Sequence, residues 1–267
     1  MTTLKAVVFD WAGTTIDHGS RAPMGAFVEV FAQFGVEISI AEARGPMGMA
    51  KWDHIRTLGR HPRIAAAWQA THGRDFTDAD ADAIHDVFVP LNARVVVDHA
   101  TLIPGVADML AGLRARGLRI GSTTGYTRQI MAPLLPLAAA QGYAPDNLVC
   151  AGDLPRARPS AMMMYRCFLD LDVDPAASVV KVDDTAPGIA EGVAAGCWTV
   201  GVTLTGNECG LSLEELAARP PAEVAALRDA AAWKLRVAGA HYILDSAALL
   251  LPVLEDISAR LARGERP

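Results

Sequence analysis

The sequence predicts an α/β fold, a doubly wound parallel sheet with an all-helical domain inserted after its first strand. The first observation is the apolar run Ala6–Phe9, which stops at Asp10 and opens into a Gly-Thr-Thr turn. The second is the alternation of apolar strand-like runs with helical patterns after residue 101, which is typical of a parallel sheet. The third is that residues 18–100 show helical periodicity and no buried strand pattern.

These patterns divide the chain into two predicted domains. We expect a core domain of residues 1–17 and 101–267 and a helical cap domain of residues 18–100. The connectors near residues 17–21 and 99–104 should act as hinges between them. A chain of 267 residues is long enough for two domains of this size.

Each predicted element follows from a local pattern. After Ala6–Phe9, strands are expected where short apolar runs end in polar or glycine-rich turns: Leu118–Thr123, Leu148–Cys150, Ser178–Val182, Trp198–Val202 and His241–Leu244. Cap helices are expected at Pro23–Phe34, Ile40–Arg44, Met47–Leu58, Pro62–Thr71 and Asp78–Val97, the last kinked or broken at Pro90. Core helices are expected at Gly105–Arg116, Arg128–Ala140, Ser160–Leu171, Gly188–Ala195, Ser212–Ala238 and Ala247–Arg263.

Composition narrows the class of protein. The formal net charge of −6 is evidence against binding to nucleic acid or to an anionic membrane surface through bulk charge, and no apolar run is long enough to span a bilayer. The chain enters its first strand without a charged-then-apolar leader, and its four cysteines lack zinc-type spacing. We therefore expect a cytoplasmic protein with reduced cysteines.

Three predicted strands end in turns that carry chemical groups. These turns contain Asp10, Thr124-Gly125 and Asp183-Asp184. Because parallel strands bring their carboxyl ends to one side of a sheet, the side chains should converge there. Neighbouring carboxylates repel one another unless a cation lies between them, and oxygen ligands without Cys or His favour Mg²⁺.

Such a magnesium site beside a hydroxyl-lined turn suggests a phosphoryl substrate. An arginine should complete the site, and the loop after the third strand offers Arg158, with Arg156 as a competitor.

The chain resembles the haloacid dehalogenase-like superfamily in these motifs, which occur in that superfamily's order: Asp10-x-Ala12-Gly13-Thr14, Ser122-Thr123-Thr124-Gly125, Arg158 and Val182-Asp183-Asp184. The helical insertion is similar to the cap of the first cap class. The resemblance implies that Asp10 attacks phosphorus and becomes an aspartyl phosphate.

Two residues narrow the resemblance. Most phosphatases of the superfamily have an acid where this chain has Ala12, so the leaving group here should not need a proton from that position. Lys51 lies on a predicted cap helix among Met and Trp residues, and an apolar pocket lowers a lysine pKa. A neutral amine can form an imine with an aldehyde, and the imine accepts the electrons released when a P–C bond breaks.

The chain therefore resembles the phosphonoacetaldehyde hydrolase (phosphonatase) family within that superfamily, in Phe9–Thr15, Pro46–Met49 with Lys51, Asp53-His54 and Gly121–Arg128. The resemblance implies cleavage of phosphonoacetaldehyde to acetaldehyde and phosphate during 2-aminoethylphosphonate degradation. It also implies a homodimer, for which the apolar helix Pro23–Phe34 is a candidate interface.

The resemblance assigns roles to residues of this sequence. Lys51 forms the Schiff base, and His54 is either a proton-transfer group or a structural helix residue. Mg²⁺ is held by Asp10, the carbonyl of Ala12 and Asp184, with Asp183 as a further or water-mediated partner. The remaining substrate and phosphate contacts are Gly13, Met47, Thr124, Gly125, Tyr126 and Arg158, of which Met47 shields Lys51.

Two alternative functions remain at this point. A capped phosphatase or phosphomutase acting on phosphate esters would have to work without an acid at Ala12. A non-catalytic phospho-acceptor module, phosphorylated on Asp10, would need neither the helical insertion nor Lys51.

Overall fold

The computed structural model describes residues 3–267 and contains a six-stranded sheet in which every neighbouring pair is parallel. The strand order is β3-β2-β1-β4-β5-β6. The strands are β1 (Ala6–Phe9), β2 (Arg119–Thr124), β3 (Val149–Cys150), β4 (Val179–Asp183), β5 (Trp198–Val202) and β6 (Tyr242–Leu244). This confirms the predicted fold class, and all six predicted strands are present.

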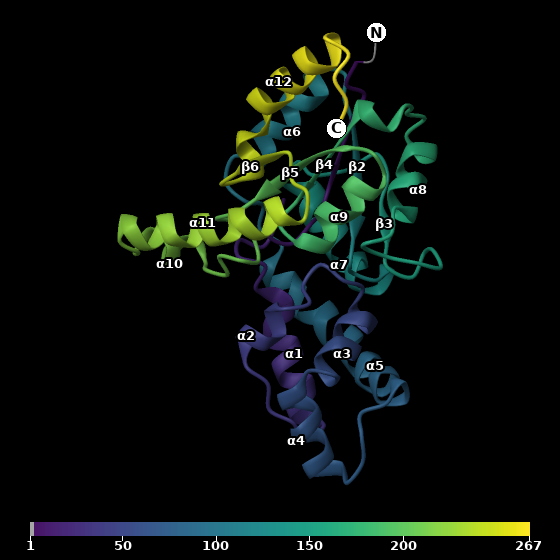
Figure 1. The fold of residues 1–267 in the computed structure, drawn as a ribbon, viewed down its shortest axis with the longest axis vertical. Helices are drawn as coiled ribbons and strands as arrows, with labels where there is room; N and C mark the ends of the chain where they lie inside the picture. Colours follow the sequence, from purple (N-terminus) through teal and green to yellow (C-terminus); the bar gives the residue numbers. More distant parts are fainter. Residues whose placement is uncertain (1–2) are drawn as a thin grey trace.

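Helices cover both faces of the sheet (Figure 1). The helices outside residues 18–100 are α6 (Val106–Ala115), α7 (Arg128–Ala140), α8 (Met162–Asp170), α9 (Ala186–Ala194), α10 (Leu213–Ala217), α11 (Pro221–Val237) and α12 (Leu250–Ala262), with 3₁₀ turns at Ala176–Ser178 and Ala247–Leu249 and a further 3₁₀ turn, Val96–His99, before α6. The side chains of β1 show why two layers form. Val7 and Phe9 belong to the core cluster shared with α6 and α12, whereas Ala6 and Val8 belong to the cluster shared with α8. Alternation along a strand buries both faces.

Residues 18–100 form five helices and no strand. The helices are α1 (Ala22–Gln33), α2 (Ile40–Arg44), α3 (Lys51–Gly59), α4 (Pro62–His72) and α5 (Asp78–Val95). Figure 1 shows these five helices, which we call the helical block (residues 22–95), grouped at one end of the molecule, below the sheet. Stacked aromatic rings join them, with Phe27 of α1 centred 4.3 Å from Phe88 of α5.

Two predicted helical segments differ from the observed helices by more than a few terminal residues. The helix predicted from Met47 begins at Lys51, because Gly48 takes a φ of +91° and keeps the preceding turn out of the helix. The region predicted as helical from Ser212 to Ala238 forms two helices, since a second helix starts at Pro221.

Of the two outcomes expected at Pro90, a kink or a break, the break is wrong, because α5 continues through Pro90 to Val95. A proline deprives the carbonyl four residues earlier of its donor. Here that carbonyl belongs to Asp86, which is exposed, as is Pro90, so water can supply the missing hydrogen bond.

In the described residues, none of the helices combines the length and the apolar character needed to cross a membrane. All four cysteines are free, as the sequence predicted, and all four are buried.

We predict that Phe27→Ala destabilises the protein by about 3–5 kcal/mol, since it removes a fully buried ring and leaves a cavity between α1, α3 and α5. Urea unfolding measures the change in the free energy of unfolding. Leu169→Ala on α8 is the control, because that side chain is 79% exposed and its loss should stay within about 0.5 kcal/mol. Equal effects of the two substitutions would contradict the packing described for the helical block.

Candidate active site

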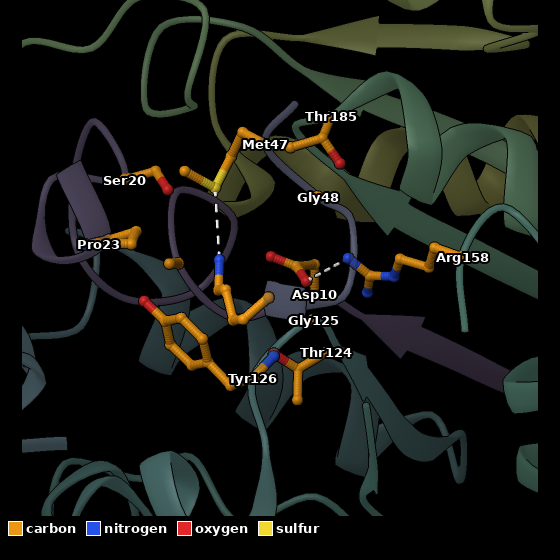
Figure 2. Close-up of a pocket in the computed structure, with 12 residues that line it drawn as sticks. Asp10, Ser20, Pro23, Met47, Gly48, Thr124, Gly125, Tyr126, Arg158 and Thr185 are labelled. Atoms are coloured by element: carbon orange, nitrogen blue, oxygen red, sulfur yellow. Dashed lines mark hydrogen bonds and ion pairs between the residues drawn. The ribbon is translucent and has the colours of Figure 1, made fainter. Parts of the chain in front are cut away.

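A small pocket lies where the carboxyl ends of the central strands meet the turn before α3 (Figure 2). The strand register explains why the loops converge, because Phe9 pairs with Ser122 of β2 on one side and with Val182 of β4 on the other. The next residues of all three strands therefore emerge together. The pocket is lined by Asp10, Ala12, Ser20, Pro23, Met47, Gly48, Lys51, Thr124, Gly125, Tyr126, Arg158 and Thr185.

Lys51 enters the pocket from the helical block. Its side chain is buried, and Nζ lies 3.8 Å from Sδ of Met47 and 5.0 Å from the centre of the Tyr126 ring. Burial lowers the pKa of Lys51 to about 8, although the charge of Asp10 opposes the shift. Met47 precedes α3 instead of lying on it, yet it still contacts Lys51 as predicted.

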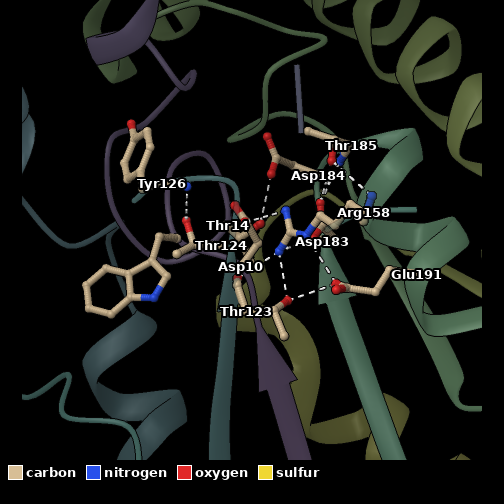
Figure 3. Close-up of polar contacts among 12 residues, drawn as sticks. Asp10, Thr14, Thr123, Thr124, Tyr126, Arg158, Asp183, Asp184, Thr185 and Glu191 are labelled. Carbon is tan, nitrogen blue, oxygen red and sulfur yellow. Dashed lines mark hydrogen bonds and ion pairs between the residues drawn. The ribbon is translucent and has the colours of Figure 1, made fainter. Parts of the chain in front are cut away.

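Arg158 occupies the centre of the charged cluster (Figure 3). Its guanidinium lies 2.7 Å from Asp10, 3.3 Å from Asp183 and 3.1 Å from Glu191. The side chain is buried, whereas Arg156 is exposed on the same loop. The structure thus brings Arg158, and not Arg156, to Asp10.

Sequence reasoning missed two members of this cluster, Lys181 and Glu191. Lys181 Nζ lies 3.0 Å from Asp183, 3.4 Å from Glu191 and 2.7 Å from Oγ1 of Thr123. All of these side chains are fully buried. The sequence could have indicated this pair, because a lysine within the apolar strand Val179–Asp183 needs a buried partner of opposite charge.

Three carboxylates gather beside the pocket. Ligand atoms of Asp10, Asp183 and Asp184 lie within 4.8 Å of one another. Burial, opposed by Arg158 and reinforced by the charge of Asp183, raises the pKa of Asp10 to about 6. Burial and the charge of Asp10 raise the pKa of Asp184 well above its usual value. A cation placed between these two groups would favour their charged forms.

Asp183 and Asp184 differ in their partners. Burial works against ionisation of Asp183, but Arg158 and Lys181 overcome it and hold its pKa below the ordinary value. Asp184 instead accepts hydrogen bonds from neutral donors, Oγ1 of Thr14 at 2.9 Å and the backbone N–H of Asn207 at 2.7 Å. The carboxylates that lack a full countercharge are Asp10 and Asp184, so the donor set fits a hard divalent cation.

Glycines allow loops to approach closely here. Gly13 has a φ of +84°, and a Cβ on it would lie 2.3 Å from Oδ2 of Asp184. A Cβ on Gly125 would lie 2.5 Å from the carbonyl oxygen of Met49 in the helical block. Any side chain at either position would push the acid or the helical block out of place.

Some predicted site residues do not line the pocket. Gly13, Asp183 and Asp184 are not among the lining residues: Asp183 pairs with Arg158, and Gly13 packs against Asp184. His54 is buried in the helical block, where its ring stacks on Phe27 at 3.9 Å and its Nε2 lies 2.8 Å from the carbonyl oxygen of Ala43. Burial lowers the pKa of His54 well below its usual value, which favours the neutral ring.

The structure adds four lining residues that the predicted site did not include: Ser20, Pro23, Gly48 and Thr185. They come from the first connector, the start of α1, the turn before α3 and the start of α9, where Gly48 and Thr185 are next to predicted site residues.

The fold and the site together define a class of hydrolase. The family model for haloacid dehalogenase-like hydrolase matches residues 4–196, and the chain belongs to that family. Phosphonoacetaldehyde hydrolase from Paraburkholderia xenovorans is 56% identical and that from Klebsiella pneumoniae is 51% identical, with all of each chain covered. The crystal structure of a phosphonoacetaldehyde hydrolase-like protein from Oleispira antarctica matches with a TM-score of 0.98 and 45% identity, over 99% of this chain and 96% of that one.

We predict that Arg158→Ala weakens the binding of inorganic phosphate by about tenfold or more, because hydrogen bonds to charged groups each contribute about 1.5–3 kcal/mol. Titration calorimetry with Mg²⁺ present measures the affinity. The matched control is Arg156→Ala, which removes the same charge from the exposed part of the loop and should leave phosphate binding unchanged. Equal losses in the two variants would show that overall charge, and not the position of Arg158, governs anion binding.

Proposed function

We propose that the protein hydrolyses the P–C bond of phosphonoacetaldehyde to acetaldehyde and phosphate. The observation that carries the proposal is a buried amine, Lys51, sharing one small pocket with the carboxylate of Asp10, while the position of the usual acid is Ala12. The full-length relatives named phosphonoacetaldehyde hydrolase support the same substrate.

In the first step, the neutral amine of Lys51 attacks the aldehyde carbon. One proton is taken up, water leaves, and a protonated C=N bond replaces the C=O bond. The lowered pKa of Lys51 makes the neutral amine available near neutral pH. Met47, the ring of Tyr126 and the ring of Phe27 surround Nζ and keep bulk water from the imine.

In the second step, a carboxylate oxygen of Asp10 attacks phosphorus and the P–C bond breaks. Its electron pair moves into a C=C bond, and the protonated imine becomes an enamine. Arg158 and the turn at Thr124-Gly125 bind phosphoryl oxygens and stabilise the charge that develops on them. No alkoxide leaves, which is why Ala12 can replace an acid.

In the last steps, the enamine carbon takes up a proton and water hydrolyses the resulting protonated imine, which releases acetaldehyde, the amine and a proton. Another water attacks the phosphoryl group on Asp10 and releases phosphate. The ring of His54 stacks on Phe27 and does not reach the pocket around Lys51. We therefore assign His54 to holding the ring of Phe27 in place and not to a direct contact with the imine.

We propose that Mg²⁺ is held by Asp10, Asp184 and the backbone carbonyl of Ala12, while Asp183 serves the cationic cluster of Arg158 and Lys181. When bound, the ion neutralises the carboxylates and the phosphoryl oxygens, so that an anionic nucleophile can approach an anionic substrate.

The two alternative functions explain fewer features of the site than the proposed one does. A phosphatase or phosphomutase for phosphate esters has no use for a buried lysine with a lowered pKa, and Ala12 cannot protonate an alkoxide. A phospho-acceptor module has no use for a pocket closed by helices. Both predict that Lys51 is dispensable.

We further propose a cytoplasmic homodimer, in line with the similarity to the phosphonatase family and with four free cysteines. The apolar face of α1 is not free to form the interface, because Phe27 and Phe31 are fully buried within the subunit. The mass in solution, measured by light scattering, tests the dimer.

We predict that borohydride, added with phosphonoacetaldehyde, reduces the imine and leaves a two-carbon label on Lys51, which peptide mass mapping detects. Lys51→Arg should abolish the label and lower acetaldehyde release by roughly a thousandfold or more, as expected when a covalent-catalysis residue is lost.

The matched control is Lys234→Arg on α11, whose side chain pairs with Glu208 on the surface. It should retain full activity and the Lys51 label. A fully active wild-type enzyme without label on Lys51 would refute the Schiff base.

We predict a pH dependence for imine formation in the enzyme. The reactive amine is the deprotonated form, so the trapping rate should rise with pH and level off above about 8, the pKa of Lys51. At pH 7 about a tenth of such an amine is neutral, against far less than a hundredth for an ordinary lysine. The initial rate of cyanoborohydride trapping at fixed aldehyde measures the profile. A rate that still climbs steeply at pH 10 would contradict the lowered pKa.

A further inference from the structure

Arg44 links the helical block to two segments outside it. It is the last residue of α2 and is half-buried. Its Nη1 donates to the carbonyl oxygens of Gly19 at 2.9 Å and Asn207 at 3.1 Å, and to Oδ1 of Asn207 at 3.2 Å. Its Nη2 donates to the carbonyl oxygen of Gly210 at 3.1 Å. One guanidinium thus holds the first connector and the loop after β5.

Several hydrogen bonds and an ion pair hold α2, the helix that carries Arg44, in place. The side chain of Ser39 caps α2, and Glu42 closes the capping box by accepting from the backbone of Ser39. Arg63 of α4 pairs with Glu42 and also donates to the carbonyl oxygen of Glu37 at 3.0 Å. Arg44 therefore moves with the helical block as a whole.

The other side of the contact reaches the predicted metal site. The backbone N–H of Asn207 donates to Oδ2 of Asp184 at 2.7 Å, and Asn207 is buried. A Cβ on Gly206 would lie 2.5 Å from Cβ of Asp184, so the loop packs directly on that acid. The same residue, Asn207, accepts from Arg44 and donates to Asp184.

We propose that Arg44 is a positioning residue that couples closure of the helical block to the orientation of Asp184, and through it to binding of a divalent cation. This inference rests on the proposed metal site. Coupling between two equilibria is reciprocal, so closure should strengthen cation binding and the cation should favour closure.

In this structure the helical block covers the pocket, which explains why such coupling is needed. The pocket leaves about 20 Å³ for water-sized molecules, room for about one or two waters, so substrate entry requires the helical block to move away. That motion separates Arg44 from Asn207 and Gly210. The loop then loses the contact that fixes the N–H bound to Asp184.

Two other contacts across the same boundary are steric. Gly48 and Thr185 meet closely, since a Cβ on Gly48 would lie 2.3 Å from Oγ1 of Thr185. Gly125 meets the carbonyl of Met49 in the same way. These are steric contacts that set how closely the surfaces approach, whereas the charged hydrogen bonds of Arg44 are directional and connect to the acid.

The first experiment measures Mg²⁺ binding by calorimetry without substrate. Arg44→Met should weaken the affinity by about fivefold or more, the lower end of ordinary coupling strengths. Arg60→Met is the matched control, because Arg60 is an exposed arginine of the helical block that pairs with Asp78 there. It should bind Mg²⁺ like the wild type. Should Arg44→Met fold poorly, Arg44→Lys keeps the charge and most of the bulk but cannot reach all four acceptors, and it should show an intermediate loss.

The second experiment tests reciprocity by hydrogen exchange of the amides in residues 40–59. Mg²⁺ should slow their exchange in the wild type and in Arg60→Met, and should have little effect in Arg44→Met. Equal Mg²⁺ affinity and equal Mg²⁺-dependent protection in Arg44→Met and wild type would overturn the coupling. Both readouts are independent of turnover: a wild-type protein that shows the coupling but releases no acetaldehyde would refute the proposed function and leave the inference standing.

Discussion

The structure depends on the charge balance at the carboxyl ends of β1 and β4. Four buried acids gather there, Asp10, Asp183, Asp184 and Glu191, against the buried cations Arg158 and Lys181. Two like charges 4 Å apart repel by about 4 kcal/mol at an effective dielectric constant of 20. Arg158 and Lys181 lie among Asp183, Glu191 and one oxygen of Asp10, which leaves Asp184 without a cation. A divalent ion beside Asp10 and Asp184 would complete the balance.

The sheet brings these charged side chains together and also fixes their positions. Parallel pairing of β1 with β2 and β4 aligns the strand ends, so side chains distant in sequence meet without long loops. Burying a charge is costly unless it is paired, and Lys181 lies in the middle of a buried strand. Its contacts with Asp183, Glu191 and Thr123 therefore hold together β4, α9 and β2, and they fix the acids that surround Arg158.

Sequence reasoning recovered the sheet well, because apolar runs and turn residues are local signals. It also found the residues at strand ends, since topology brings such positions together in any parallel sheet. It could not choose between Arg156 and Arg158, because only the path of the loop decides which one turns inward. It missed Glu191, which looks like an ordinary helix residue until Lys181 is seen beside it. It placed Met47 on a helix, because periodicity does not reveal the left-handed turn at Gly48.

The environment of Lys51 connects the charge balance to the chemistry. Desolvation is the largest influence on its pKa, and the desolvating groups come from both parts of the fold: Met47 and Phe27 from the helical block, and Tyr126 from the loop after β2. Separating the two parts would expose the amine and return its pKa toward that of free lysine. Closure would therefore raise the neutral fraction of the Lys51 amine as well as dry the pocket, whereas an exposed Lys51 would be almost entirely protonated near neutral pH. In the proposed mechanism, the motion that admits the aldehyde would thus also keep most of the Lys51 amine protonated until the two parts of the fold close over the phosphoryl group.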